Sequence, residues 1–284
     1  MGLAFIGMMI PDGSNQFFSR LAQLVQRELS VSGCGMLLFD ADGSAPKELE
    51  YIRWIAEQRG HESISAVVYI PTEDNLENFQ ELFALNDLPI VVLDREVPEG
   101  FSGRPVDLVL GDNALGMKLV ADHLTQIGVS TVAYVGASGH NEPARMRHEY
   151  FKQYSAQECG IEVLASFYGD FSFEAGRLAG ESILRLEQLP DAVVAANDLM
   201  AIGVLQALLR EKKRVPDDVV VTGYDDIPIA NWVFPPLTTV RQDVEEMARQ
   251  AAALVMRRIA GVSGPGGVRA PIDPELVIRG SSER

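Results

Sequence analysis

Short apolar runs alternate with longer amphipathic stretches along most of the chain. The first run, residues 3–10, is followed by a helical stripe formed by Phe17, Phe18, Leu21, Leu24 and Val25. The same alternation predicts strands at 35–39, 64–70 and 89–94 and helices at 47–58 and 76–85. The runs are apolar throughout, which is typical of strands buried on both faces of a sheet. Repeated β-α-β units therefore predict parallel strands with right-handed crossovers.

A second series of the same kind begins after residues 95–106, a loop rich in proline, glycine and charge. The run VDLVLGD precedes it, and the later strands are expected at 131–136, 162–169, 191–197 and 218–225. Helices are expected at 114–128 and 143–159, from about Ser172, and up to Leu209. The two series predict an α/β protein made of two doubly wound parallel-sheet lobes.

One more helix (244–261) and a last short strand (274–280) follow the second series. Extra elements after two complete lobes indicate that the chain crosses between the lobes more than once, as in a hinge. We expect an N-terminal lobe of residues 1–110 and 241–262 and a C-terminal lobe of 111–240 and 263–284.

Composition and charge exclude several classes of protein. The chain of 284 residues has 47% hydrophobic and 23% charged residues, the usage of a globular protein, and a formal net charge of −16. This charge argues against nucleic-acid binding by these residues themselves, although simple solubility also explains an acidic surface. Cys34 and Cys159 have no C-x-x-C spacing, and the four histidines form no metal-binding array, so neither a metal nor a cofactor is expected. No signal peptide or membrane span is evident, which predicts a cytoplasmic protein without a membrane partner.

Polar residues recur directly after the apolar strands, where open α/β sheets bind ligands. They are Asp12 to Asn15, Asp94 and Arg95, Asp112 and Asn113, Asn197 and Asp198, and Asp225 and Asp226. Because Asp and Asn also cap helices, capping is favoured for Asp12, Asn113 and Asp198. Asp94 is not followed by a helical turn. Pro228 indicates a short helix whose cap is Asp226 or Ile227, which leaves Asp225 free to point into a cleft.

An arginine and a pair of aromatics complete the candidate site. Arg145 and Arg147 lie in the first turns of a helix, where the helix dipole disfavours cations. A solvated side chain explains Arg145, whereas Arg147 is the better candidate for a fork that grips hydroxyls or a carboxylate. Trp232 and Phe234, in a proline-rich loop, could stack on a ligand ring.

These residues together resemble the LacI/GalR family of bacterial transcription regulators, whose core is similar to periplasmic sugar-binding proteins. The resemblance lies in IGMMIPDGSNQFF (6–18), VVLDR (91–95), GDNALGMKLVADHLTQIGVSTVAYVG (111–136), ARMRHEYF (144–151), GDFSFEAG (169–176), VVAANDLMAIGVLQAL (193–208), VPDDVVVTGYDDIPIANWVFPPLTTVRQD (215–243) and PELVIRGSS (274–282). It implies a periplasmic-binding-protein-like type I core, in which two lobes joined by a three-crossover hinge bind a sugar-like effector between them, and which forms a homodimer.

Carried over position by position, the resemblance assigns ligand contacts to Asn15, Phe17, Asp94, Arg147, Asn197, Asp225 and Gln242. Trp232 is added as a stacking residue. The family's helix-turn-helix head, which would precede the first strand, is expected to be absent, so operator DNA would be bound only through that head. The predicted function is that of an effector-binding regulatory core, with a sugar, polyol or sugar acid as ligand.

Two other functions compete with this interpretation. The first is a glycosidase that uses Asp225 and Asp226 as its carboxylate pair. Adjacent residues of a strand point to opposite faces, so these two cannot easily flank one bond, and no catalytic residue is expected. The second is a transport-associated or stand-alone sugar-binding protein, which the lack of a signal peptide disfavours.

Overall fold

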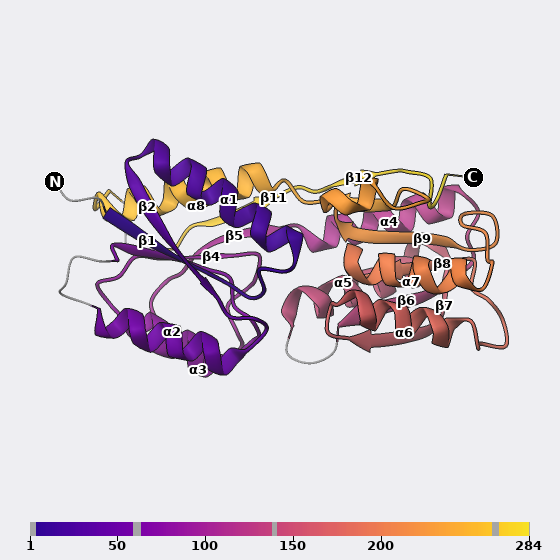
Figure 1. The fold of residues 1–284 in the computed structure, drawn as a ribbon, viewed down its shortest axis with the longest axis horizontal. Coiled ribbons are helices and arrows are strands. Elements are labelled where there is room, and N and C mark those ends of the chain that lie inside the picture. The colour runs from indigo at the N-terminus through magenta and orange to yellow at the C-terminus, as the bar shows by residue number, and fades with distance from the viewer. Residues whose placement is uncertain (1–3, 59–63, 138–140, 263–266, 284) are drawn as a thin grey trace. The chain divides into compact units, whose positions relative to one another are not determined.

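The chain folds into two compact units, each built around its own parallel sheet (Figure 1). The computed structural model describes residues 4–58, 64–137, 141–262 and 267–283. The first unit comprises residues 1–111 and 243–272, and the second comprises residues 112–242 and 273–284. The chain thus passes from one unit to the other after Gly111, Gln242 and Ile272. The predicted fold class, two doubly wound α/β lobes, is confirmed.

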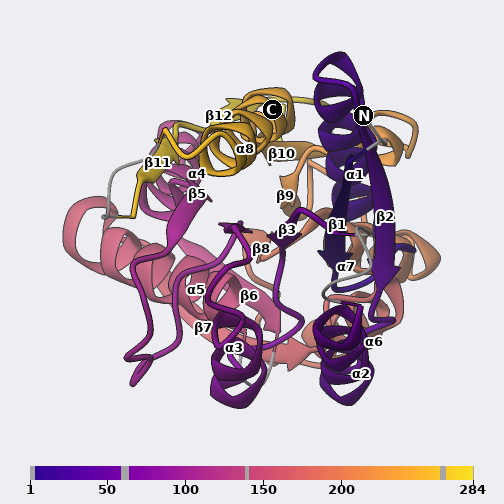
Figure 2. The ribbon, with the colours of Figure 1, turned by 90° about the vertical axis from the view of Figure 1, so that its left-hand side faces the viewer.

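In the first unit, six described strands lie in the order β11-β5-β4-β3-β1-β2, and every neighbouring pair is parallel. Their bounds are β1 Ala4–Ile10, β2 Cys34–Asp40, β3 Ala66–Tyr69, β4 Ile90–Leu93, β5 Asp107–Gly111 and β11 Arg269–Ile272. Figure 2 shows α1 (Gln16–Val31) and α8 (Val244–Ile259) together on one face of the sheet. The helices α2 (Ala45–Glu57) and α3 (Leu76–Phe83) cover the other face.

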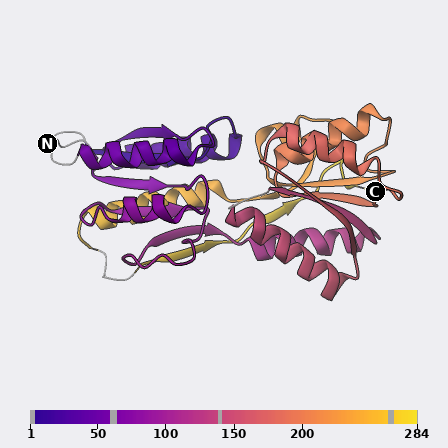
Figure 3. The same cartoon turned by 90° about the horizontal axis from the view of Figure 1, so that it is seen from below.

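The second unit repeats this plan with the order β12-β10-β9-β8-β6-β7. Its strands are β6 Thr131–Ala137, β7 Glu162–Gly169, β8 Ala192–Ala195, β9 Val220–Asp225, β10 Thr238–Arg241 and β12 Glu275–Val277. Strand β12 is antiparallel to β10, and the other pairs are parallel. The view of Figure 3 shows the sheet of this unit between two helix layers. They are α4 (Asn113–Gln126) with α5 (Glu142–Tyr154), and α6 (Phe173–Ile183) with α7 (Asp198–Arg210).

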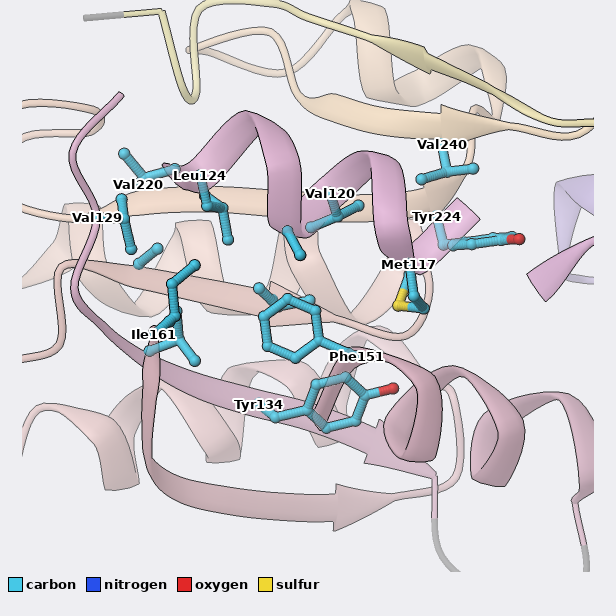
Figure 4. Close-up of a cluster of buried hydrophobic side chains, with 14 of the residues drawn as sticks. Met117, Val120, Leu124, Val129, Tyr134, Phe151, Ile161, Val220, Tyr224 and Val240 are labelled. Carbon is cyan, nitrogen blue, oxygen red and sulfur yellow. The ribbon is translucent and has the colours of Figure 1, made fainter. Parts of the chain in front are cut away.

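The core of the second unit lies between the sheet and the α4–α5 layer (Figure 4). Met117, Val120 and Leu124 of α4 lie about one helical turn apart and are fully buried, as the amphipathic pattern predicts. They contact Tyr134 and Phe151 from β6 and α5 within the same cluster. The packing fixes α5 against the sheet, and α5 carries Arg147.

Side-chain caps start the helices that follow the strands. Asn15 Oδ1 accepts from Phe17 N, Asp112 Oδ1 from Leu115 N, and Asn197 Oδ1 from Met200 N. The expectation that Asp12, Asn113 and Asp198 are the caps is therefore wrong, in each case because another polar residue nearby lies where its side chain reaches the first turn.

Two predictions about the last part of the chain also need correction. The sequence pattern places residues 263–284 in the C-terminal lobe, but Arg269–Ile272 form β11, which pairs with β5 in the first sheet. Residues 263–266 lie outside the described part of the chain. The sequence pattern also gives no strand between residues 226 and 243, but Thr238–Arg241 form β10 before the chain leaves the second unit.

Candidate functional site

The polar residues predicted as ligand contacts lie where parallel strands end, in both units. In the second unit these strands are β8, β9 and β10, which run in one direction, so the residues after them share one edge of the sheet. Asn197 follows β8, Asp225 ends β9 and Gln242 follows β10. This edge is where open α/β sheets bind ligands.

Arg147 lies buried at this edge, with only 3% of the residue exposed, and several contacts hold its side chain. Its Nε donates to Asn113 Oδ1 at 2.8 Å, and its Nη1 donates to the carbonyl oxygen of Ala196 at 2.8 Å. The guanidinium lies over the ring of Tyr224, 3.7 Å from the ring centre. The planar fork is thereby fixed in orientation before any ligand arrives.

Asp225 connects this arginine to Gln242. Arg147 Nη1 lies 3.5 Å from Asp225 Oδ1, and Gln242 Nε2 donates to the same oxygen at 3.0 Å. All three side chains are buried, and Gln242 Oε1 has no hydrogen-bond partner among the described residues. The arrangement offers an amide acceptor, a carboxylate and an oriented cation, which suits a ligand with several hydroxyl groups.

Asp226 has a different environment from Asp225. Its Oδ2 accepts from Arg241 Nε at 2.6 Å, and its Oδ1 lies 2.7 Å from Arg279 Nη1. The short helix after it begins at Pro228 with Ile227 as its N-cap and without a side-chain cap bond, so of the two expected cap positions Ile227 is confirmed and Asp226 is not. Because the two carboxylates are held by separate sets of arginines, they do not form a pair around one bond.

Asp198 stabilises the turn that follows β9. It is fully buried, and its two oxygens accept from Ile227 N at 2.8 Å and from Thr239 Oγ1 at 2.5 Å. Gly223 leaves space for this carboxylate, since a Cβ there would overlap Asp198 Oδ1. Burial, and then the negative charge of Asp225, raise the pKa of Asp198 well above its ordinary value.

Asn197 has two structural bonds at the site edge. Besides capping α7, it donates from Nδ2 to the carbonyl oxygen of Phe171 at 3.0 Å. Phe171 itself has a φ of 65°, an uncommon conformation for a bulky residue, and stands in the turn after β7. The sequence analysis did not single out Phe171; an aromatic directly after Gly169-Asp170 was the available signal.

The structure does not bring Trp232 into this cluster. Trp232 and Phe234 are 75% and 85% exposed, in the loop after the short 3-10 helix Pro228–Asn231 (η2). None of the ring contacts or hydrogen bonds found among the described residues joins Trp232 to Arg147 or Asp225. Its role in ligand binding stays a prediction.

In the first unit, three predicted residues lie at the ends of β1 and β4. Asn15 caps α1, and Phe17 is buried with its ring edge against Phe18, 5.2 Å between centres. Asp94 follows β4, is buried, and has a φ of 65°. A positive φ at a non-glycine residue after a strand turns the backbone sharply and directs the next side chains.

Arg95 is among the polar residues noted after the strands in the sequence, but it was not chosen as a ligand contact. It is only 3% exposed, and its Nε and Nη1 have no partner among the described residues. A buried guanidinium with unused donors is costly unless a ligand or water completes it. Its position at the start of a loop rich in proline and charge concealed its burial, although it stands beside Asp94 after an apolar strand.

A buried network lies near Arg95. Glu48 accepts from Tyr69 OH at 2.6 Å, from Asn78 Nδ2 at 2.8 Å and from Thr72 N at 2.6 Å. Burial, and then the charge of Glu48, raise the pKa of Tyr69 well above its ordinary value, whereas the charge of Arg95 lowers it. The influence of Arg95 on this tyrosine places its positive charge near the network.

Comparison with known proteins identifies this architecture. The family model of the periplasmic binding protein-like domain matches residues 121–282. The chain belongs to this family. Within it the chain has the core of the LacI-type regulators: it is 29% identical over 279 residues to the ribose operon repressor of Escherichia coli strain K12, covering 98% of this chain and 82% of the repressor.

Solved structures agree in fold with this LacI-type core. A LacI family transcriptional regulator from Enterococcus faecium with bound ribose has a TM-score of 0.84 at 24% identity, covering 98% of both chains. The dimeric Lac repressor with an 11-residue C-terminal deletion has a TM-score of 0.85 at 22% identity, also covering 98% of both chains.

Metal sites and membrane-spanning helices are two further features to consider in the described residues. These residues contain no group of three or more His, Cys, Asp or Glu side chains that could hold a metal ion. They also contain no helix with the length and apolar composition needed to cross a membrane. The relatives of this LacI-type core are transcriptional repressors rather than enzymes.

Proposed function

We propose that this LacI-type core binds a pentose, with D-ribose as the first candidate, and that binding changes the operator affinity of a homodimeric regulator. The observation that carries the proposal is the triad of Arg147, Asp225 and Gln242. The Asp225 carboxylate can accept from ligand hydroxyls, the Arg147 guanidinium beside it is held in a fixed plane, and Gln242 Oε1, which has no hydrogen-bond partner among the described residues, can accept from a further hydroxyl.

The charge balance of this triad favours a neutral sugar over a sugar acid in the second unit. Asp225 is buried beside Arg147, so their charges already offset each other. A carboxylate ligand placed against Asp225 would add a second buried negative charge at a cost. In the first unit, Asn15, Phe17, Asp94 and Arg95 are proposed as the further ligand contacts. An aromatic face suits the apolar side of a sugar ring.

Related proteins support the choice of ligand and the regulatory role. The Escherichia coli relative is named a ribose operon repressor, and the Enterococcus faecium regulator is described with bound ribose. We propose that the protein acts in the cytoplasm, as a transcription regulator must, and reaches operator DNA through a helix-turn-helix head. Since ligand can shift only an equilibrium between states that it binds differently, the regulatory effect requires different ribose affinities in the two states.

Calorimetric titration and thermal unfolding with D-ribose test the proposal. At a concentration 100 times the dissociation constant, the ligand should raise the free energy of unfolding by about 2.7 kcal/mol. D-xylose, D-glucose, ribitol and D-gluconate form the comparison panel. A folded protein that binds gluconate but no neutral sugar would contradict the charge argument.

Variants at the triad assign the site. Asp225→Asn and Arg147→Ala should each remove ribose-induced stabilisation, because they delete the hydroxyl acceptor and the fork. Arg145→Ala is the matched control: it lies in the same helix, is exposed, and pairs only with Glu149 among the described residues. Ribose binding of wild-type strength in folded Asp225→Asn would refute the assignment.

A further inference from the structure

A pair of arginines holds the residue next to the proposed hydroxyl acceptor. Asp226 is paired through Oδ2 with Arg241 of β10 and through Oδ1 with Arg279, which follows β12 near the end of the chain. Arg279 Nη1 also donates to the carbonyl oxygen of Leu237 at 2.9 Å. Because Asp226 Oδ1 has no hydrogen-bond partner among the described residues, its contact with Arg279 is an ion pair only. The carboxylate of Asp226 is 8% exposed, which strengthens both interactions relative to surface pairs.

The backbone at this point needs such support. Asp225 has a φ of 107° and Asp226 a φ of 50°, so two successive non-glycine residues occupy conformations that L-residues disfavour. Conformations of this kind persist only where the surroundings determine them. Here the surroundings are the arginine pair on one carboxylate and the bonds of Asp198 to Ile227 N and Thr239 Oγ1.

The segment that carries Arg279 is itself fixed to the sheet. Arg279 N donates to Thr238 Oγ1 at 2.8 Å, and that hydroxyl donates to the carbonyl oxygen of Arg279 at 2.9 Å. Ser281 Oγ donates to the carbonyl oxygen of Val221 at 2.6 Å and accepts from Thr238 N at 2.8 Å. His123 Nε2 lies 2.7 Å from Ser282 Oγ, which anchors the segment to α4 as well.

We propose that Arg279 is a positioning residue for effector binding: it holds the strained Asp225–Asp226 turn through Asp226, so that the Asp225 carboxylate points at the ligand. Arg241 shares this task, because it pairs with Asp226 and directly precedes Gln242, the other partner of Asp225. The C-terminal segment thereby sets the affinity of a site that none of its residues touches. This role rests on the proposed contact between Asp225 and the effector.

The clamp is the hold that Arg279 has on the Asp225–Asp226 turn through Asp226. Hydrogen exchange of the ligand-free protein tests it. In Arg279→Ala, the amides of residues 224–231 should exchange at least about tenfold faster than in the wild type, whereas amides of β6 and β8 keep their rates. Arg279→Lys should restore part of the protection, since it keeps the charge but not the fork. Unchanged exchange at 224–231 in folded Arg279→Ala would overturn the clamp.

The affinity for ribose tests whether this contact positions Asp225 for effector binding. Arg279→Ala and Asp226→Asn should each weaken binding about five- to twentyfold. The double variant should bind ribose no more weakly than the single variant with the larger loss of affinity, because both substitutions remove the same interaction. Arg214→Ala, which breaks exposed pairs with Asp217 and Asp218 in the same unit, is the control and should bind as the wild type does.

The outcomes separate this inference from the proposed function. Faster exchange together with wild-type affinity would refute the positioning role, although the clamp exists. If wild-type protein binds no sugar of the panel, the proposed function fails, and the exchange experiment alone still decides whether Arg279 holds the turn.

Discussion

At the residue scale, the site depends on the contacts that the Arg147 guanidinium makes. One guanidinium donates to a side chain and to a carbonyl, lies over Tyr224, and balances Asp225. Its position in the first turns of α5, where a cation gains nothing from the helix dipole, was the sequence signal for this role. Arg145, two residues earlier, is half exposed and pairs with Glu149, as expected for a solvated arginine.

Replacing Arg147 by lysine should separate charge from geometry. Lysine keeps the charge but cannot make the two hydrogen bonds in one plane, so the free energy of unfolding should fall by about 2–4 kcal/mol. Urea unfolding measures the loss. Arg145→Lys is the control and should change stability by less than about 0.5 kcal/mol. Equal effects of the two substitutions would show that the bonds of Arg147 contribute little.

Asp198 makes a prediction about pH. Its pKa is raised in the folded state above its ordinary value of 3.8, first by burial and then by Asp225, so the folded protein holds this proton more tightly than the unfolded chain. Stability is therefore lost as the pH rises from about 3.8 through the raised pKa. In the Asp198→Asn variant the side chain cannot titrate, and its amide oxygen can still accept from Ile227 N.

The measurement for Asp198 is the difference in unfolding free energy between Asp198→Asn and the wild type at several pH values. This difference should move in favour of Asp198→Asn as the pH rises from about 4.5 to 8, by about 1.4 kcal/mol for each unit by which the pKa is raised within that range. Parallel stability curves would contradict the shift. The comparison between two proteins cancels the contributions of groups that do not interact with Asp198.

At the element scale, most helices and strands could be predicted from the sequence because they follow long apolar runs or helical stripes. Strand β1 and helices α2 and α8 are examples: the predicted spans differ from the observed ones by at most two residues at each end. Strands β10 and β11 could not be predicted, because neither is an apolar run: β10 has the sequence TTVR, and β11 has the sequence RAPI with Pro271 inside it. No local pattern reports that β11 pairs with a strand about 160 positions earlier.

The same distinction holds for the candidate site. Asp225 follows an apolar run, so its place at a sheet edge could be inferred. Gln242 follows the unpredicted strand β10 and was assigned only through the family resemblance. Arg95 could not be recognised, because burial of a charged residue depends on packing that forms only in three dimensions. The caps were displaced by one to three positions for a similar reason: several polar residues follow each strand, and only the backbone geometry decides which one reaches the helix.

The contact of α6 with α7 offers a test of packing between elements. A Cβ on Gly203 would overlap the carbonyl oxygen of Phe173 and lie 2.5 Å from Arg177 N, so the two helices touch through their backbones. Gly203→Ala should lower the free energy of unfolding by about 3 kcal/mol, because backbone must move. Gly160→Ala, at a φ of 65° in open space, is the control and should cost about 1 kcal/mol.

At the scale of the whole molecule, neither unit is a continuous segment of sequence. The second unit takes residues 112–242 from the middle of the chain and 273–284 from its end. The end supplies β12 and the residues Arg279, Ser281 and Ser282, which bond to β9, β10 and α4. A fragment of residues 112–242 alone thus lacks the partners of several buried groups.

This composition predicts a minimal folded unit. Joining Gln242 directly to Asp273 leaves Gln242, Asp273 and Pro274 to connect β10 with β12, whose antiparallel register places Arg241 opposite Glu275. A three-residue connection is common in hairpins. The joined chain should unfold cooperatively in circular dichroism, whereas residues 112–242 alone should not. Cooperative unfolding of the shorter fragment would show that the C-terminal segment is dispensable.

The edge strands of the two sheets affect the tendency of the protein to aggregate. Strand β12 has three residues, β11 contains a proline, which cannot donate to a further strand, and the pairing of β7 with β6 shifts register between Val132 and Ala133. Short strands, proline and irregular edges all oppose the addition of a foreign strand. Three of the four edges are thus poor templates for fibril growth, and the long β2 edge is the place where stress-induced aggregation would begin.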